Sequence, residues 1–216
     1  MMTNRKVLIL SAHPDDEAIG CGGVIARLSS EGYNSTLITF TDGIGSRLRG
    51  GDRRHEVEQS ASILGISQFV CGDFPDNMMD SVPLLEVCQF IEANVEDKYD
   101  VILTHHPHCL NIDHKVVFEA TRVVFRPQSG YEHSLYAYPV SSSTNYNPIA
   151  NNLTPVYFDV AGYVDQKMGA LKIYAGEMRP DPHARSVENV INMMKVWGSE
   201  VGLKYAEKLY HIRSVI

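Results

Sequence analysis

Residues 7–17 read VLILSAHPDDE, a run of β-prone apolar side chains that gives way at once to a polar cluster. Residues 7–10 show no alternation of apolar and polar side chains, which is typical of a strand buried on both faces of a sheet. His13, Asp15 and Asp16 follow directly, and Pro14 favours an extended backbone at His13. The stretch predicts a buried strand that ends in a loop of chemically active side chains.

The same order of elements recurs through the first 125 residues. Strands are predicted at about 7–10, 37–40, 69–71 and 101–104, each followed by a polar loop and a helix. Repeats of this kind form a parallel sheet with helices on both faces. We therefore expect an α/β fold, a Rossmann-like three-layer sandwich with a mostly parallel central sheet.

Local signals set the expected limits of several helices. The helix at about 53–64 should end at Gly65, and Ser81 should cap a helix that has Pro83 in its first turn. After residue 126 the pattern weakens. We expect a loop region with a strand or two at 129–152, and we expect helices at about 163–175, 186–197 and 199–207. No repeat or linker interrupts the chain, so residues 1–216 are expected to form one domain.

Composition excludes several classes of partner. The chain has 216 residues, 44% of them hydrophobic, and a net charge of −7 without a run of Lys and Arg, so nucleic acid is not an expected partner. No apolar stretch approaches the ~20 residues of a membrane span, and no signal peptide is recognisable, which predicts a cytoplasmic protein. None of the four cysteines forms a CxxC pair; Cys21, Cys71 and Cys88 are interpreted as reduced core thiols.

Polar loops follow all four predicted strands, at 13–17, 42–49, 73–80 and 105–114. Ligands bind outside the carboxyl ends of the strands in sheets of this type, so these loops are expected to share one site. Residues 20–23 (GCGG) do not form a dinucleotide loop, because the spacing is not GxGxxG and carboxylates occupy the phosphate position.

The loop residues suit a catalytic metal. His13 and Asp16 are competent zinc ligands, and His114 is the best third ligand from another strand end. Asp113 is expected to hold the imidazole of His114 by a hydrogen bond, and Asp15 is placed to take a proton from water. Three ligands with an open position indicate hydrolysis by Zn²⁺, although the same ligands suit another divalent metal such as Fe²⁺.

These motifs resemble those of the PIG-L/LmbE-type zinc-dependent N-acetylglucosaminyl de-N-acetylases. The resemblance rests first on residues 12–17 (AHPDDE), a highly specific signature, and extends over most of the chain. It implies zinc bound by His13, Asp16 and His114, Asp15 as general base, Arg53 reaching into the substrate cleft, and a possible homo-oligomer. The individually weaker matching segments are 53–56, 64–65, 74–77, 104–107, 111–115 and 182–186.

The sequence departs from the family pattern at Asn111. Many members have a His there that protonates or stabilises the tetrahedral intermediate, whereas an amide donates a hydrogen bond but supplies no proton. Asp15 returning its own proton to the amine, or His183 acting as acid or oxyanion donor, are the alternatives. The histidines at 105, 106 and 108 form a further cluster, of which at most one or two should line the cleft.

Four further loop residues are candidate ligands for sugar hydroxyl groups. They are Asp42 and Ser46 in the second loop and Asp76 and Asn77 in the third. The competing interpretation of Asp42-Gly43 and of Asp76-Asn77 is turn chemistry, which both pairs suit.

The expected function is hydrolysis of a linear amide bond, removing the N-acetyl group from an N-acetylated amino sugar or its conjugate. Two alternatives remain open. One is an amidase that acts on a non-sugar N-acyl metabolite, and the other is a non-catalytic Rossmann-like binding module. The intact set of His13, Asp15, Asp16 and His114 disfavours the second alternative.

Overall fold

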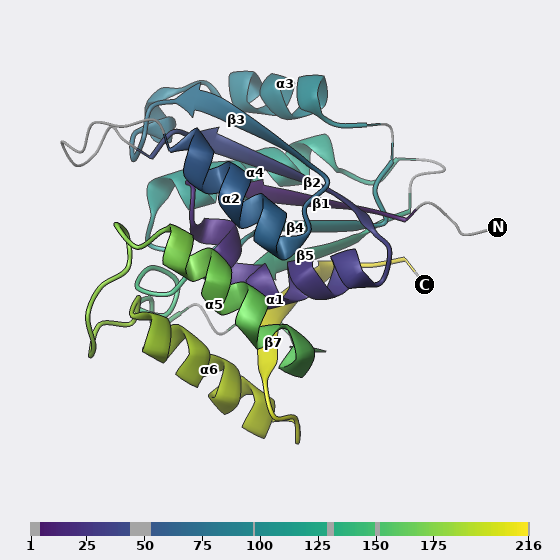
Figure 1. The fold of residues 1–216 in the computed structure, drawn as a ribbon. Coiled ribbons are helices and arrows are strands. Elements are labelled where there is room, and N and C mark those ends of the chain that lie inside the picture. The colour runs from purple at the N-terminus through teal and green to yellow at the C-terminus, as the bar shows by residue number, and fades with distance from the viewer. Residues whose placement is uncertain (1–4, 44–52, 97, 129–131, 150–151, 216) are drawn as a thin grey trace.

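A computed structural model describes residues 5–43, 53–96, 98–128, 132–149 and 152–215. Its centre is a seven-stranded sheet of order β3-β2-β1-β4-β5-β7-β6 (Figure 1). The first five strands in this order are parallel, and β7 runs antiparallel to both β5 and β6. The strands are β1 (Lys6–Ser11), β2 (Asn34–Thr41), β3 (Gln68–Phe74), β4 (Val101–His105), β5 (Ser134–Tyr138), β6 (Pro155–Asp159) and β7 (Ala206–Arg213).

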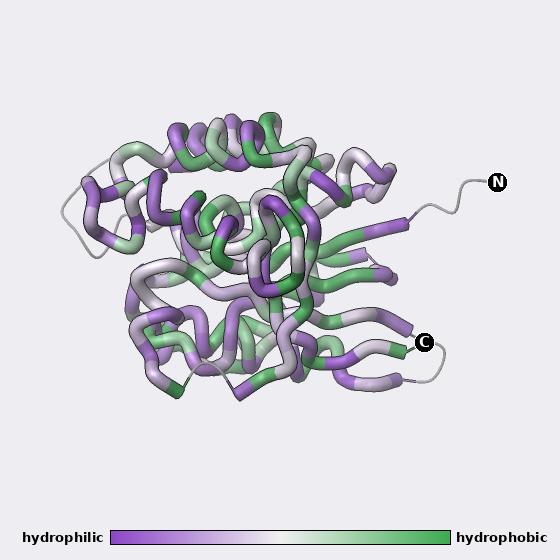
Figure 2. The backbone as a smooth tube through the Cα atoms, turned by 90° about the horizontal axis from the view of Figure 1, so that it is seen from below, coloured by the Kyte–Doolittle hydropathy of each residue, from purple (hydrophilic) through white to green (hydrophobic). Residues whose placement is uncertain are grey.

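Helices cover both faces of the sheet, which confirms the predicted three-layer α/β fold. Helices α1, α2, α5 and α6 contribute to one core, whereas α3 and α4 contribute to the other. In Figure 2 hydrophobic (green) and hydrophilic (purple) residues are interspersed along the helices, as expected for elements with one buried face. The α-helices are α1 (Asp16–Ser30), α2 (Arg54–Leu64), α3 (Leu84–Asn94), α4 (Ile112–Val124), α5 (Val164–Ile173) and α6 (Val187–Ser199), and the 3₁₀ turns are η1 (Met79–Ser81) and η2 (Ala161–Tyr163).

Strand β1 lies between β2 and β4 and is buried on both faces, as its unbroken apolar run predicted. Val7 and Ile9 pack in the core under α1 and α2, and Leu8 and Leu10 pack in the core under α3 and α4. This alternation is the two-residue period of a strand. The order of the parallel strands brings the loops that follow β1 and β4 side by side.

Helix α1 is kinked at Cys21, where φ is −145°. A kink releases backbone N–H groups, and the carboxylate of Glu207 on β7 accepts two of them, from Gly23 at 3.0 Å and from Val24 at 2.6 Å. Lys167 of α5 pairs with the same carboxylate, and both charged side chains are almost fully buried. The motif-bearing helix is therefore joined to the last strand of the sheet.

Two local predictions were wrong. Residues 199–207 do not form a helix: Gly202 adopts φ +76° in a turn, and β7 begins at Ala206 because pairing with β5 and β6 outweighs the local helical spacing. Ser81 does not cap α3. It lies in η1 and donates its hydroxyl to the carbonyl of Met78 at 2.7 Å, and Pro83 is the N-cap residue.

Other limits agree closely with the sequence. Gly65 ends α2 at φ +74°, and Ser186 caps α6 by accepting from the N–H of Asn189 at 3.1 Å. All four cysteines lie in described residues, and none is in a disulfide. Within the ranges given above, no helix combines the length and the apolar character needed to cross a membrane.

Candidate metal centre and active site

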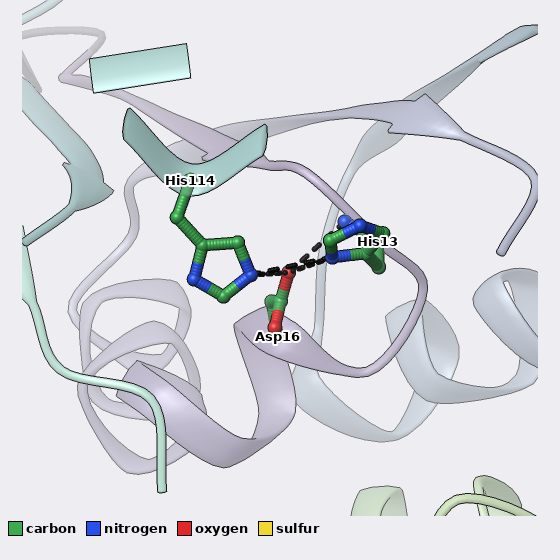
Figure 3. A group of neighbouring side chains, drawn as sticks. All are labelled: His13, Asp16 and His114. Carbon is green, nitrogen blue, oxygen red and sulfur yellow. Dashed lines mark hydrogen bonds and ion pairs between the residues drawn. The ribbon is translucent and has the colours of Figure 1, made fainter. Parts of the chain in front are cut away.

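Three side chains from two neighbouring loops point at one another (Figure 3). His13 and Asp16 come from the loop and helix start after β1, and His114 lies in the first turn of α4 after β4. Nδ1 of His13 is 3.1 Å from Oδ2 of Asp16, and Nε2 of His114 is 3.2 Å from the same oxygen. The two ring nitrogens are 3.3 Å apart. The structure thus brings together the three predicted ligands.

This triangle has the dimensions of a metal site. Ligands about 2.1 Å from a tetrahedral metal are about 3.4 Å from one another, close to the three separations found here. Asp16 is 1% exposed, and its Oδ1 has no hydrogen-bond partner among the described residues. A buried carboxylate oxygen without a partner is costly unless a cation satisfies it. The donor set of two imidazoles and one carboxylate therefore fits a divalent metal ion.

Two further carboxylates orient His13 from its other side. Nε2 of His13 is 2.9 Å from Oδ2 of Asp113 and 3.2 Å from Oδ1 of Asp76. Asp113 also accepts the backbone N–H groups of Asn77 at 2.6 Å and Met79 at 3.0 Å, which fixes its position. A partner on Nε2 leaves Nδ1 of His13 available as a metal ligand.

Asp113 was expected to orient His114, and the structure places it on His13 instead. Adjacent residues of a helix project about 100° apart, so Asp113 and His114 at the start of α4 face different neighbours. Burial opposes a charge on His13, but hydrogen bonds to Asp113, Asp16 and Asp76 outweigh it and raise the pKa of His13 well above its ordinary value. Metal binding at His13 must therefore displace a proton.

His114 is oriented by a thiol. Its Nδ1 lies 3.1 Å from Sγ of Cys109, which is 2.9 Å from Oγ of Ser143. The ring of His105 stacks on His114 with centroids 3.9 Å apart, and its Nε2 accepts the N–H of Ala12. His105 therefore packs against the ring of His114 and helps to hold it in place. Sequence reasoning gave Cys109 no role, and its position five residues before His114 is the only local signal.

Asp15 is held in a strained backbone conformation beside the triangle. Its φ is +120°, a region that non-glycine residues rarely adopt and that is typical of functional sites. Its N–H donates to Oε2 of Glu17 at 3.2 Å, and its carboxylate lies 3.4 Å from Nη1 of Arg185. Burial raises the pKa of Asp15 to about 7, against the opposing effect of Arg185 and with a further increase from Asp16.

Arg53 lies where the sequence placed it, at the start of α2 next to the motif loop. Its Nη2 donates to the carbonyl of Pro14 at 2.8 Å and its Nε to Glu56 at 2.7 Å. Gly43 leaves room for this guanidinium: its φ is +68°, and a Cβ there would come within 2.6 Å of Nη1 of Arg53. Arg185 is a second cation beside Asp15, and its only sequence signal is its place in the matching segment 182–186.

Of the two predicted turn pairs, Asp76-Asn77 forms a turn, whereas Asp42-Gly43 lies at a bend next to residues outside the described ranges. Asn77 has φ +55°, and its side-chain amide donates to Asp76 at 2.8 Å. Asp76 is only 6% exposed and faces His13, whereas Asp42 is exposed. Ser46 lies outside the described residues. A role for these side chains in sugar binding stays a prediction.

The two candidate oxyanion donors have structural partners. Oδ1 of Asn111 caps α4 by accepting the N–H groups of Asp113 and His114, and its Nδ2 donates to Asn77 at 2.9 Å, which leaves one N–H of the amide. Nδ1 of His183 accepts the N–H of Arg185 at 3.0 Å, so Nε2 of His183 carries the proton. His183 thus has its Nε2–H as a donor, and Asn111 has one of its two amide N–H groups left as a donor.

Comparison with known proteins agrees with this site. A family model described as PIG-L, GlcNAc-PI de-N-acetylase, matches residues 8–125. The chain is 30% identical over 138 residues to the uncharacterized deacetylase YaiS of Escherichia coli, covering 59% of this chain and 74% of that protein. It is also 30% identical over 154 residues to the 1D-myo-inositol 2-acetamido-2-deoxy-alpha-D-glucopyranoside deacetylase of Corynebacterium glutamicum, covering 61% of this chain and 49% of that protein, so it spans about half of that relative.

Solved structures share the whole fold at low identity. N,N'-diacetylchitobiose deacetylase from Pyrococcus horikoshii aligns with a TM-score of 0.75 and 22% identity, over 96% of this chain and 84% of that one. A zinc-inhibited form of the teicoplanin deacetylase Orf2 aligns with a TM-score of 0.79 and 14% identity, over 97% and 98% of the two chains. At these identities the likeness establishes the fold alone.

Proposed function

The chain belongs to the PIG-L family of GlcNAc-PI de-N-acetylases, and we propose that it is a metal-dependent hydrolase that removes the N-acetyl group from an N-acetylated amino sugar or its conjugate. The observation that carries this proposal is the buried triangle of His13, Asp16 and His114 with Asp15 beside it. Two relatives support the same reaction by their names: the protein from Escherichia coli is a deacetylase, and the protein from Corynebacterium glutamicum is a deacetylase of an acetamido sugar.

His13 Nδ1, Asp16 and His114 Nε2 would hold the metal, for which we propose Zn²⁺, with Fe²⁺ as the alternative that the same ligands accept. A bound zinc supplies a water molecule of lowered pKa and a Lewis acid for the substrate carbonyl. The protein's own part is to keep both histidines oriented, through Asp113 on His13 and Cys109 on His114.

Asp15 serves as the proton carrier in this proposal. Burial raises the pKa of Asp15 to about 7 without a metal, and a bound metal would lower it, so the carboxylate form is available near neutral pH. It accepts a proton from water, whose oxygen then attacks the acetyl carbonyl carbon. The same carboxyl group returns the proton to the amide nitrogen as the C–N bond breaks. The products are acetate and a free amino sugar, so one group performs both transfers and no separate acid is needed.

Positive groups near Asp15 suit the charge that develops on the carbonyl oxygen. Arg185 lies against Asp15. His183 lies in the same loop as Arg185, and its Nε2–H is a hydrogen-bond donor. We propose that His183 donates to the oxyanion, a contact whose loss typically costs two to three orders of magnitude in kcat. Arg53, held on Pro14, sets the position of the motif loop and is proposed to contact the sugar.

The test combines metal analysis with acetate release from a panel of N-acetylated sugars and non-sugar amides. Wild type should bind about one metal per chain and release acetate from the sugars. Asp15→Asn should retain the metal and lose acetate release, whereas His114→Ala should lose both. Asp165→Asn, an exposed acidic residue in the first turn of α5, is the matched control and should behave as wild type.

Other outcomes point to the two alternatives. Release of acetate from non-sugar amides alone would replace the sugar substrate by another N-acyl metabolite. A wild-type protein that binds no metal and stays inactive after addition of zinc or iron would overturn the mechanism and favour a binding module.

A further inference from the structure

The kink of α1 is bridged by two charged side chains from distant elements, where α1, α5 and β7 meet (Figure 1). In a regular helix the N–H of Gly23 would donate to the carbonyl of Ile19, four residues before it. Here that N–H donates to Oε1 of Glu207 at 3.0 Å, and the carbonyl of Ile19 accepts from Nζ of Lys167 at 2.8 Å. Nζ of Lys167 also contacts Oε1 of Glu207, so the ion pair connects the two groups of one helical hydrogen bond.

The glycine motif at residues 20–23 (GCGG) makes room for this ion pair, although it forms no dinucleotide loop. The backbone leaves helical geometry at Cys21, two residues before the first N–H that Glu207 accepts. A Cβ at Gly23 would lie 3.0 Å from Cβ of Val160 and 3.2 Å from Cδ of Glu207, closer than an ordinary van der Waals contact. The absence of a side chain at position 23 therefore lets the carboxylate approach the helix backbone.

The ion pair is a poor means of stabilising the fold. Lys167 is 1% exposed and Glu207 is 0% exposed, so both charges have lost their hydration. Replacing a buried pair of this kind by apolar side chains is often neutral or even stabilising. What apolar side chains would not supply is direction, because only polar groups can hold the backbone N–H groups of Gly23 and Val24 and the carbonyl of Ile19 at fixed positions.

The first turn of α1 is the part of the active site that this pair fixes. The N–H of Ile19 donates to the carbonyl of Asp15 at 2.9 Å, while the carbonyl of Ile19 accepts from Lys167. A single residue thus connects Lys167 to Asp15, and Asp16 begins the same turn. A displacement of this turn would therefore move the proposed proton carrier and one proposed metal ligand together.

We propose that Lys167 and Glu207 are positioning residues of the active site. By bridging the kink of α1 they fix the first turn of that helix, and they hold Asp15 and Asp16 in the geometry that proton transfer and metal binding require. The proposal rests on the proposed function for the roles of Asp15 and Asp16. It gives α5 and β7 a part in the activity through side chains that touch neither metal nor substrate.

Two double variants separate the hydrogen-bond acceptor from the charges. Lys167→Met with Glu207→Ala removes both charges and both carboxylate oxygens, whereas Lys167→Met with Glu207→Gln removes the charges and retains one acceptor oxygen. Neither variant leaves a single buried charge, so both should fold. The affinity for Zn²⁺ is measured by competition with a chelator below the melting temperature of each variant, and kcat and KM for acetate release are measured at saturating zinc.

The alanine double variant should bind Zn²⁺ at least about tenfold more weakly than wild type, because one ligand is misplaced. Its kcat should fall by at least about tenfold while KM stays within about twofold, because the proton carrier is misplaced as well. The glutamine double variant should recover most of both losses. Lys208→Met with Glu200→Ala is the matched control: it removes a more exposed pair, 2.7 Å apart, on the same strand and should behave as wild type.

A pair of glycine variants tests the same contact without removing either charge. Gly23→Ala places a methyl group between α1 and Glu207, whereas Gly22→Ala places one 3.4 Å from Cγ of Lys167, an ordinary contact. Both substitutions bring the same gain in helix propensity. Gly23→Ala alone should weaken zinc binding and lower kcat.

The proposal is overturned if the alanine double variant melts at a lower temperature but binds Zn²⁺ and releases acetate as wild type does, since the pair would then be structural only. Equal losses in the alanine and glutamine double variants, or equal behaviour of Gly22→Ala and Gly23→Ala, would also overturn it.

The proposed function is judged separately, by metal content and acetate release of the wild-type protein. Zinc binding that weakens as expected, in a protein whose wild type releases no acetate, would support the positioning role and reject the deacetylase. Acetate release by wild type, with unchanged zinc affinity and kcat in the alanine double variant, would reject the positioning role alone. A wild-type protein that binds no metal would overturn both.

Discussion

The backbone N–H of Asp15 donates to the carboxylate of Glu17, two residues further on, at 3.2 Å. The other oxygen of this fully buried carboxylate accepts the hydroxyl groups of Ser60 at 2.9 Å and Tyr174 at 2.7 Å. Helix α2 and the end of α5 thus hold the turn in which Asp15 adopts its positive φ. Glu17 thus positions Asp15, the proposed proton carrier, through a backbone hydrogen bond.

Replacing Glu17 by alanine should therefore impair both stability and catalysis. Each buried hydroxyl left without a partner costs about 1–3 kcal/mol, so the melting temperature should fall clearly. Release of Asp15 from its turn should lower kcat by at least about tenfold, because misplaced catalytic groups lose rate steeply. Glu17→Gln retains an acceptor oxygen and should recover much of both losses. Glu188→Ala, acidic and exposed in the first turn of α6, is the control.

Asp113 should control metal affinity without being a ligand. Its hydrogen bond to Nε2 of His13 fixes the ring that presents Nδ1 to the metal. Loss of such a contact typically weakens metal binding by about 10–100-fold. The metal affinity of Asp113→Ala, measured by competition with a chelator, should show this loss. Asp165→Asn, measured in the same way, is the control. An affinity equal to that of wild type would mean that Asp76 alone orients His13.

Arg185 should set the pH at which activity begins. Asp15 must be ionised to accept a proton, so kcat/KM should rise as pH increases through the pKa of Asp15, which burial raises to about 7 when no metal is bound. The Arg185 guanidinium stabilises the ionised carboxylate and lowers this pKa; its removal therefore raises it. Arg185→Ala should move the acid limb of kcat/KM to higher pH than in wild type. A bound metal lowers the pKa in both proteins, so the difference between them is the measurement.

For that profile, Arg122→Ala is the control, because Arg122 pairs with Glu119 at an exposed site on α4. An acid limb at the same pH in Arg185→Ala and wild type would show that Arg185 does not act on Asp15. A loss of kcat/KM at every pH, with no displacement, would assign Arg185 to substrate binding instead.

Gly43 should be required for the position of Arg53. Gly43 and Gly202 both have positive φ, at +68° and +76°, so alanine strains either backbone by about 1–2 kcal/mol. Only at Gly43 would the new methyl group meet another side chain, Arg53; at Gly202 nothing lies within 4 Å. Both variants should lose similar stability in thermal melts, but Gly43→Ala alone should lose acetate release. Equal acetate release by Gly43→Ala and Gly202→Ala would show that catalysis does not depend on the position of Arg53.

The sequence predicted the parts of this molecule that depend on neighbours along the chain. The apolar run of β1 and the polar ends of successive parallel strands were sufficient to place His13, Asp16 and His114 together, because parallel topology brings those ends to one edge. The αL end of α2 at Gly65 followed from local glycine chemistry in the same way.

The remainder depends on contacts between distant segments. Arg185 approaches Asp15 across 170 residues of chain, and β7 displaces a locally plausible helix because two strands pair with it. The direction in which the Asp113 side chain points was also not predicted from the sequence. Whether it contacts His13 or His114 is decided by the rotation of one helical residue relative to the next. Cys109 was missed because a thiol is an uncommon partner for a ligand histidine.

The kink of α1 has a consequence for the order in which the chain is assembled during synthesis. The N–H groups of Gly23 and Val24 find their acceptor only in Glu207, 184 and 183 residues later. When β1, α1 and α4 have left the ribosome, the three proposed metal ligands have all been synthesised, yet helix α1 still lacks the carboxylate of Glu207 at its kink. We therefore expect a chain that ends before β7 to hold a metal ion less tightly than the full chain, because the helix that carries Asp16 is not yet fixed at its kink.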